Sequence, residues 1–228
     1  AAMLATTAST IDAAADELGR LDAIAGDGDH GIGMQHGARA AREAAEKLGD
    51  SAGAESLLRA AGEAWADRAG GTSGALWGAM LRAAGEVLGN DEAPDAQRAS
   101  AAITAAVQAV EARGGAELGD KTMVDAIVPF AREFEQAVAG GATAAAALQA
   151  AARAATGAAA ATADLAPRRG RARHDRGRPV APRKLLDLLE GPVEEIVRAL
   201  APAPVDGGGR VEAGMQHLAL GGKARIDH

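Results

Sequence analysis

Residues 21–31, Leu-Asp-Ala-Ile-Ala-Gly-Asp-Gly-Asp-His-Gly, are the stretch from which the architecture of this chain can be inferred. Asp22, Asp27 and Asp29 gather three carboxylates in a glycine-rich segment, and carboxylates so close together repel one another. A hard cation would hold them together, and Mg²⁺ prefers oxygen ligands and often binds phosphates as well. The segment favours a magnesium or magnesium–phosphate site, and a solvated acidic turn remains open as the alternative.

The composition around this stretch predicts an all-α protein. The chain has 228 residues, enough for one large domain or two small ones, and it is rich in alanine, the best helix former. Residues that favour strands are scarce, because aromatic residues make up 2% of the chain and Tyr is absent.

Charge and composition also argue against several classes of partner. A formal net charge of -7 is opposite to the basic footprint of a nucleic-acid-binding protein. No apolar run approaches the roughly 20 residues that span a bilayer, and residues 1–20 do not resemble a signal peptide. The absence of Cys excludes disulfides and thiolate metal sites. We therefore expect a cytoplasmic protein that binds neither nucleic acid nor membrane.

Apolar residues recur at three- and four-residue steps, and glycine-containing breaks separate the resulting helices. The predicted helices cover residues 5–19, 34–48, 53–69, 73–89, 95–113, 121–139 and 143–164. Pro129 should kink the sixth helix or mark a restart. Short connections between seven helices predict antiparallel packing in a bundle or closed helical barrel.

Three junctions between a loop and a helix could bind phosphate. The first is residues 26–33, which matches a dinucleotide-binding glycine pattern but lacks the strand that this pattern requires. The second is residues 70–74, where Thr72 or Ser73 could instead cap the next helix. In the third, residues 119–123, Asp120 could cap and Lys121 could be merely solvated. Helix N-termini favour anions, so the three junctions together suggest one ligand cradle.

These three motifs, in this order, resemble the nucleotide-binding L subunit or domain of dihydroxyacetone kinases, the DhaL family. Residues 21–33 resemble its metal loop, residues 70–78 its second loop and residues 113–129 its third loop. The resemblance covers residues 5–171 and implies an eight-helix antiparallel barrel that binds a nucleotide at one end.

The resemblance also implies which residues form the site. Two Mg²⁺ ions would be held by Asp22, Asp27 and Asp29 beneath the phosphates of ADP or ATP. The residues implied to line the nucleotide are His30, Gly31, Ile32, Gly33, Thr72, Ser73, Gly114, Met123 and Arg171.

In this family the ketose is bound by a separate K subunit or domain. The resemblance therefore implies a kinase that is active only with a DhaK-like partner, with no catalytic residue in this chain. In some members the donor is ATP, and in others a phosphotransferase-system protein rephosphorylates bound ADP. The start Ala-Ala-Met favours a piece of a single-chain ketose kinase. The alternatives are a non-catalytic nucleotide-binding regulator and a magnesium-dependent hydrolase.

The chain departs from the family pattern after Gly170-Arg171-Ala172. The family continues with a Ser-Tyr-Leu-Gly-Glu-Arg-like stretch and Asp-Pro-Gly, whereas residues 173–179 are Arg-His-Asp-Arg-Gly-Arg-Pro. A shifted reading frame in a GC-rich gene is one hypothesis for this composition. We divide the chain into a nucleotide-binding domain, residues 1–171, and a divergent segment, residues 172–228, with one predicted helix over 184–200.

Overall fold

The computed structural model describes residues 2–24, 26–49, 51–91 and 93–168. In this part of the chain, all regular secondary structure is helical, and loops connect the helices. Its elements are α1 (Ala2–Asp22), α2 (His30–Leu48), α3 (Ala54–Ala69), α4 (Gly71–Leu88), α5 (Ala96–Gly114), α6 (Val124–Ala139), α7 (Ala144–Ala161) and the short 3₁₀ helix η1 (Thr162–Asp164). None of the described helices is both long and apolar enough to cross a membrane.

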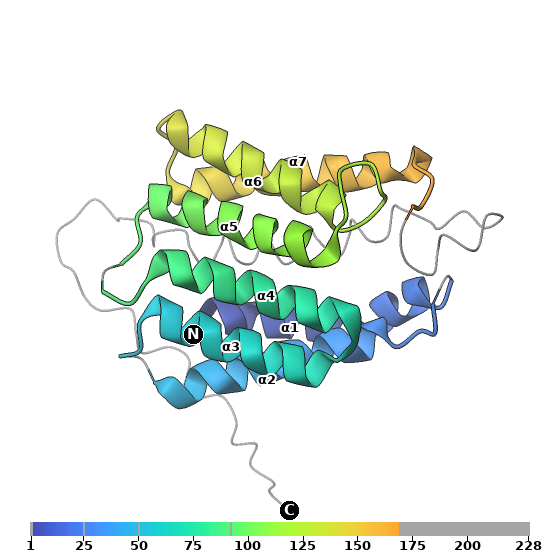
Figure 1. Ribbon diagram of the computed structural model, residues 1–228, viewed down its shortest axis with the longest axis horizontal. Helices are drawn as coiled ribbons and strands as arrows, with labels where there is room; N and C mark the ends of the chain where they lie inside the picture. Colours follow the sequence, from blue (N-terminus) through green and yellow to red (C-terminus); the bar gives the residue numbers. More distant parts are fainter. Residues whose placement is uncertain (1, 25, 50, 92, 169–228) are drawn as a thin grey trace, which may run out of the picture.

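Each helix packs against the helices that precede and follow it in the chain, and successive helices run in opposite directions (Figure 1). As a result, the α1–α2, α3–α4 and α5–α6 connections and the end of α7 all lie at one end of the molecule, on the right in Figure 1. The three junctions that the sequence singles out are these same connections, so the fold brings them to one end.

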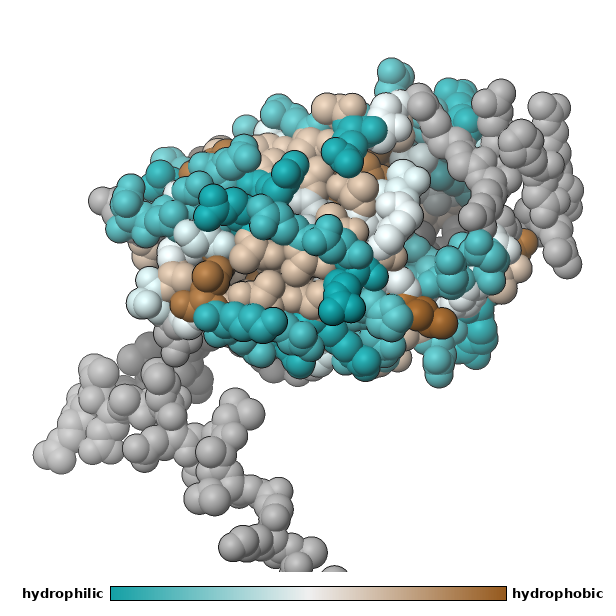
Figure 2. All heavy atoms as spheres, turned by 60° about the horizontal axis from the view of Figure 1, so that its bottom comes forward, coloured by the Kyte–Doolittle hydropathy of each residue, from teal (hydrophilic) through white to brown (hydrophobic). Residues whose placement is uncertain are grey.

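The core has two main apolar clusters, and α4 contributes to both. Trp77 and Leu81 of α4 pack against the cluster formed with α1, α2 and α3. Leu76 and Met80 pack against a second cluster, which is built around the buried valines of α5 and α6. On the face shown in Figure 2, hydrophilic residues predominate and strongly hydrophobic ones form small separate patches.

Glycines allow the helix backbones to approach closely. A Cβ atom added to Gly78 of α4 would lie 2.6 Å from the carbonyl oxygen of Gly62, and one added to Gly62 of α3 would lie 2.7 Å from the carbonyl oxygen of Gly78. Because real Cβ atoms do not approach backbone oxygens so closely, only glycine fits at this crossing.

All seven predicted helices are present, and the predicted all-α antiparallel architecture is confirmed. The largest differences in helix starts are at α2, which begins at His30 rather than at residue 34, at α6, which begins at Val124 rather than at 121, and at α1, which begins at Ala2 rather than at 5. In addition, α1 ends at Asp22 rather than at residue 19, and α7 ends at Ala161 rather than at 164. Pro129 lies inside the continuous helix α6, so of the two alternatives predicted there, a kink or a restart, the restart is excluded. The helix predicted over 184–200 lies outside the described residues, and the eighth helix and the domain boundary at 171 stay predictions.

Candidate functional site

The three aspartates of the first loop form a compact cluster. Asp22 is the last residue of α1, and Asp29 immediately precedes α2, so both helices hold the ends of the loop that carries Asp27. One carboxylate oxygen from each residue can be chosen such that all three lie within 4.8 Å of one another. Asp22 is half-buried, and Asp27 and Asp29 are exposed. This arrangement of oxygen ligands suits a hard cation such as Mg²⁺.

The loop backbone is shaped around Asp22. Its Oδ2 accepts a hydrogen bond from the backbone N–H of Gly28 at 2.8 Å. Gly28 has a φ of 81°, a conformation that favours glycine. A Cβ atom on Gly26 would lie 2.3 Å from Oδ1 of Asp22, so a larger residue would push this carboxylate away from its place in the cluster.

The N-terminus of α2 differs from the expected glycine loop, because Gly31 and Gly33 are helical residues. A Cβ atom on Gly31 would lie 1.9 Å from the carbonyl oxygen of Ala15 in α1, and one on Gly33 would lie 3.1 Å from that of Ala69 in α3. The two glycines therefore serve close packing against both neighbouring helices. Gly31 is buried against α1 and does not line the pocket described below.

The second loop is reduced to a single residue, Gly70, between α3 and α4. Gly70 and Gly71 have φ values of 65° and 60°, which permit this abrupt reversal of direction. The cap residue of α4 is Gly70 itself, so the alternative in which Thr72 or Ser73 caps the helix is excluded. Their hydroxyls lie in the first turn of α4 at the same end of the molecule as the aspartates.

An open pocket of about 280 Å³ joins the first loop to the second. Its lining consists of residues from the start of α2 and from the α3–α4 connection: Asp29, His30, Ile32, Gly33, Met34, His36, Ala69, Gly70, Gly71 and Ser73. The N-termini of α2 and α4 thus flank one hollow beside the aspartate cluster. Helix N-termini carry partial positive charge and unbonded N–H groups, so the pocket suits an anion.

The third loop joins α5 to α6 and lies on the other side of α4. Gly114 ends α5, and a Cβ atom on it would lie 3.5 Å from the Leu76 side chain. Met123 is half-buried and packs against the same apolar cluster as Leu76. Neither residue lines the pocket between the first two loops. Arg171 lies outside the described residues.

Sequence reasoning missed Asp125, which is 6% exposed and organises the third loop. Its Oδ1 accepts the backbone N–H of Gly119 at 2.6 Å, and its Oδ2 accepts that of Thr122 at 2.8 Å. The pattern Thr-x-x-Asp at 122–125 is typical of a capping box, in which the fourth residue bonds back to the N–H of the first. This signal would have moved the predicted helix start toward the observed one.

The alternatives left open for Asp120, capping, and for Lys121, solvation alone, are both contradicted. Oδ2 of Asp120 accepts the backbone N–H of Glu117 at 3.1 Å, within the loop and not at the N-terminus of α6. Nζ of Lys121 donates to the carbonyl oxygens of Ala163 and Leu165, at 3.4 and 3.0 Å, instead of being merely solvated.

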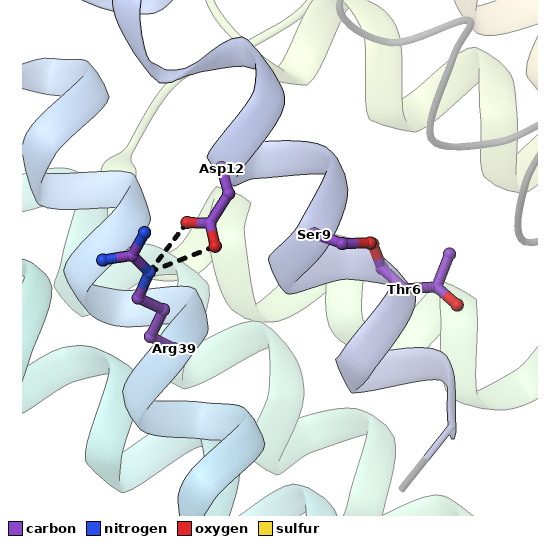
Figure 3. A network of polar contacts seen from close by, with 4 residues as sticks. All are labelled: Thr6, Ser9, Asp12 and Arg39. Atoms are coloured by element: carbon purple, nitrogen blue, oxygen red, sulfur yellow. Dashed lines mark hydrogen bonds and ion pairs between the residues drawn. The ribbon is translucent and has the colours of Figure 1, made fainter. Parts of the chain in front are cut away.

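Near the middle of α1 and α2, an ion pair links the two helices on either side of the first loop. Nε of Arg39 donates to both carboxylate oxygens of Asp12, at 2.9 and 3.1 Å (Figure 3). Both side chains are partly exposed, so we expect this pair to contribute only about 0.2–1 kcal/mol to stability.

Comparison with known proteins finds similarity over most of the described chain. The family model for the DAK2 domain matches residues 24–180. The chain is 51% identical over 161 residues to the D-erythrulose kinase of Mycolicibacterium smegmatis, covering 70% of this chain and 28% of that protein. It is 40% identical over 116 residues to the ADP-binding subunit DhaL of the PEP-dependent dihydroxyacetone kinase 2 of Listeria innocua, covering 50% of this chain and 53% of that subunit.

A solved structure shares the fold. The dihydroxyacetone kinase from C. freundii, crystallised in complex with AMP-PNP and Mg²⁺, superposes with a TM-score of 0.58 at 22% sequence identity. The match covers 87% of this chain and 33% of that one. This chain therefore corresponds to only a part of the larger kinases that it resembles.

Proposed function

The chain belongs to the DAK2 domain family, and from this premise we propose that it binds a magnesium–nucleotide complex and serves as the phosphoryl-donor domain of a ketose kinase. The single observation that carries the proposal is the position of the aspartate cluster beside a pocket flanked by two helix N-termini. Metal and phosphate would bind there side by side, as the ligands of a nucleotide site require.

In this proposal the cluster residues Asp22, Asp27 and Asp29 hold two Mg²⁺ ions, which neutralise the charge of the phosphates when bound. The N-terminal turns of α2 and α4 direct N–H groups and their positive dipole ends toward the same phosphates. His30, Ile32, Gly33 and Ser73 line the pocket and contact the ligand, and the exposed Thr72, beside Ser73 in the first turn of α4, contributes a second hydroxyl.

Phosphoryl transfer depends mainly on positioning and on charge stabilisation, which these groups would supply. The chain spans 28% of the D-erythrulose kinase and 53% of the DhaL subunit named above, so the sugar site belongs in this proposal to a DhaK-like partner domain or subunit. The donor is ATP, or a phosphotransferase-system protein acting on bound ADP.

The first test measures the melting temperature of the purified chain with and without Mg·ADP. A ligand at about 100 times its Kd stabilises the folded state by about 2.7 kcal/mol, so we expect a rise of several degrees. Asp27→Ala and Asp29→Ala should abolish the rise, because each removes an exposed metal ligand without disturbing the core. Asp91→Ala, which removes an exposed carboxylate at the opposite end of α4, is the matched control. An unchanged melting temperature in millimolar Mg·ADP would contradict the proposal.

A second measurement separates a kinase domain from a regulator or a hydrolase. We expect ketose phosphorylation only when the sugar-binding subunit of a dihydroxyacetone kinase, ATP and Mg²⁺ are added together. Nucleotide binding without turnover would identify a regulator, and nucleotide hydrolysis without the partner would identify a hydrolase. Titration with Mn²⁺ would count the metal ions, for which we expect two.

A further inference from the structure

The third loop has a backbone that would not be stable on its own. Between α5 and α6, Gly115, Gly119 and Lys121 have φ values of 60°, 91° and 61°. Lys121 is the single residue other than glycine with a positive φ in the described part of the chain. Such a conformation is unfavourable for a side chain with a Cβ atom, and it persists only where surrounding contacts impose it.

Two buried aspartates supply those contacts. Asp125 accepts the N–H groups of Gly119 and Thr122, which lie on either side of Lys121. Asp120, 7% exposed, accepts the N–H of Glu117 and so closes the first half of the loop. Hydrogen bonds to ionised acceptors are stronger than neutral ones, and a buried carboxylate needs them. The shape of the loop is therefore set largely by Asp125.

Lys121 attaches this shaped loop to the chain that leaves α7. Its ammonium group donates to the carbonyl oxygens of Ala163 and Leu165 at the end of η1, where the helix dipole favours a cation. A third link is the backbone hydrogen bond from the N–H of Arg168 to the carbonyl oxygen of Asp120, at 3.1 Å. Residues 163–168 are thus tied to a loop more than forty positions earlier in the chain.

The other side of the loop contacts the helix that borders the phosphate pocket. Gly114 adjoins Leu76 of α4, and Met123 and Leu76 pack against one apolar cluster. Leu76 follows the pocket residue Ser73 by less than one helical turn. The third loop therefore connects the pocket end of α4 with the segment that follows α7.

We propose that Asp125 and Lys121 are positioning residues for the nucleotide. Asp125 fixes the conformation of the loop that carries Met123, and Lys121 fixes this loop against the segment after α7, so that both move as one unit when nucleotide binds. This inference rests on the proposed function, because it requires a nucleotide bound at the pocket beside α4, whose Leu76 the third loop contacts.

The test compares Asp125→Asn and Lys121→Met with the wild-type chain by calorimetry. Asn keeps one acceptor and places an N–H group opposite a second N–H, while Met keeps the apolar stem of Lys and loses its donors. We expect Mg·ADP to bind about tenfold more weakly to Asp125→Asn and several-fold more weakly to Lys121→Met. Affinity for Mn²⁺ alone should be unchanged in both, since the aspartate cluster belongs to a different loop. Glu135→Gln and Lys47→Met, at exposed sites outside the loop, are the matched controls.

Hydrogen exchange provides a readout that a general loss of stability would not reproduce. In the wild type, Mg·ADP should slow exchange in both 117–122 and 162–168. In Lys121→Met the protection should persist in 117–122 and disappear in 162–168. Wild-type affinity in both variants, or an equal loss of Mn²⁺ affinity, would overturn the inference. If Asp125→Asn does not fold, Lys121→Met decides the question alone. Failure of the wild type to bind Mg·ADP would instead refute the proposed function on which the inference rests.

Discussion

At the scale of single residues, Asp22 combines two tasks that conflict in the absence of metal. Its carboxylate belongs to the acidic cluster, where like charges raise the energy of the folded state. The same carboxylate accepts the Gly28 N–H and so helps to shape the loop. If the cluster binds metal as proposed, its metal affinity is therefore gained at some expense of stability in the metal-free protein.

Replacing Asp22 by Asn separates these two tasks. Asn retains an acceptor for the Gly28 N–H and removes one charge from the cluster. Two unit charges about 4 Å apart in a water-like medium repel by about 1 kcal/mol, so the metal-free variant should be as stable as the wild type or up to about 1 kcal/mol more stable. Its affinity for Mg²⁺ should fall at least tenfold. Chemical denaturation measures the stability of the metal-free variant, and metal titration measures its affinity for Mg²⁺, with Asp91→Asn as the control for both. A clear loss of stability in the metal-free variant would contradict the argument.

Residues of the site differ in how far the sequence reveals them. The aspartate cluster was predictable because its members are neighbours in the chain and their shared chemistry is visible without a fold. The bonds from Lys121 to Ala163 and Leu165 were not predictable, because they depend on where the end of α7 lies in space. Gly31 has a helix-packing role that only the position of Ala15 on the adjacent helix explains.

At the scale of elements, the approach of α3 and α4 depends on a reciprocal pair of glycines, Gly62 and Gly78. Each glycine leaves room for the carbonyl oxygen of the other. Glycine inside a helix is unfavourable by about 1 kcal/mol relative to alanine, so its presence at this crossing reflects packing and not helix propensity.

A pair of glycine substitutions separates the contribution of helix packing to stability from that of helix propensity. Gly78→Ala and Gly157→Ala make the same change inside α4 and α7, but a Cβ atom on Gly157 meets no atom within 4 Å. We expect Gly157→Ala to stabilise the protein by about 0.5–1 kcal/mol through helix propensity. Gly78→Ala should destabilise it, because overpacking costs about 1–3 kcal/mol and exceeds that gain. The melting temperatures of the two variants provide the comparison. Equal changes in melting temperature would show that α3 and α4 can move apart without a loss of stability.

Helix positions were predictable from periodicity and glycine breaks, whereas these two features did not predict the starts of α2 and α6. Gly31 and Gly33 suggested a loop, yet contacts with α1 and α3 make them helical. The start of α6 is set by the Asp125 side chain, whose bonds to Gly119 and Thr122 hold residues 119–122 outside the helix. The start of α2 depends on tertiary contacts that local propensity does not contain, whereas the start of α6 is signalled only by the capping-box pattern at 122–125.

At the scale of the whole molecule, α4 joins the two apolar clusters. Its residues Trp77 and Leu81 belong to one side of the core, and Leu76 and Met80 to the other. A helix shared in this way should make the two halves of the described structure unfold together, because neither cluster can keep its contacts if α4 is displaced.

Val110→Ala tests this cooperativity from the side of the second cluster. Val110 is 1% exposed, and its truncation should lower the free energy of unfolding by about 2 kcal/mol. The free energy of unfolding can be measured in two ways: from urea denaturation, monitored by circular dichroism, and from the slowest-exchanging amides of α2 and α3. If α4 couples the clusters, both measurements should show the same decrease. A decrease confined to α5 and α6 would mean that the two clusters unfold independently.

The stacking of Trp65 on Trp77 gives the protein an internal optical reporter. The centroids of the two rings are 5.1 Å apart, and the sequence contains no other tryptophan. The Trp65 indole N–H has no acceptor among the described residues. The ring adjoins Gly37 of α2, and Trp65 lies one helical turn before Ala69, which lines the pocket. Trp65 therefore emits from a buried position in α3, one turn away from the candidate phosphate site. Intrinsic fluorescence can follow events at that end of the molecule in real time, without a dye, a tag or an engineered probe.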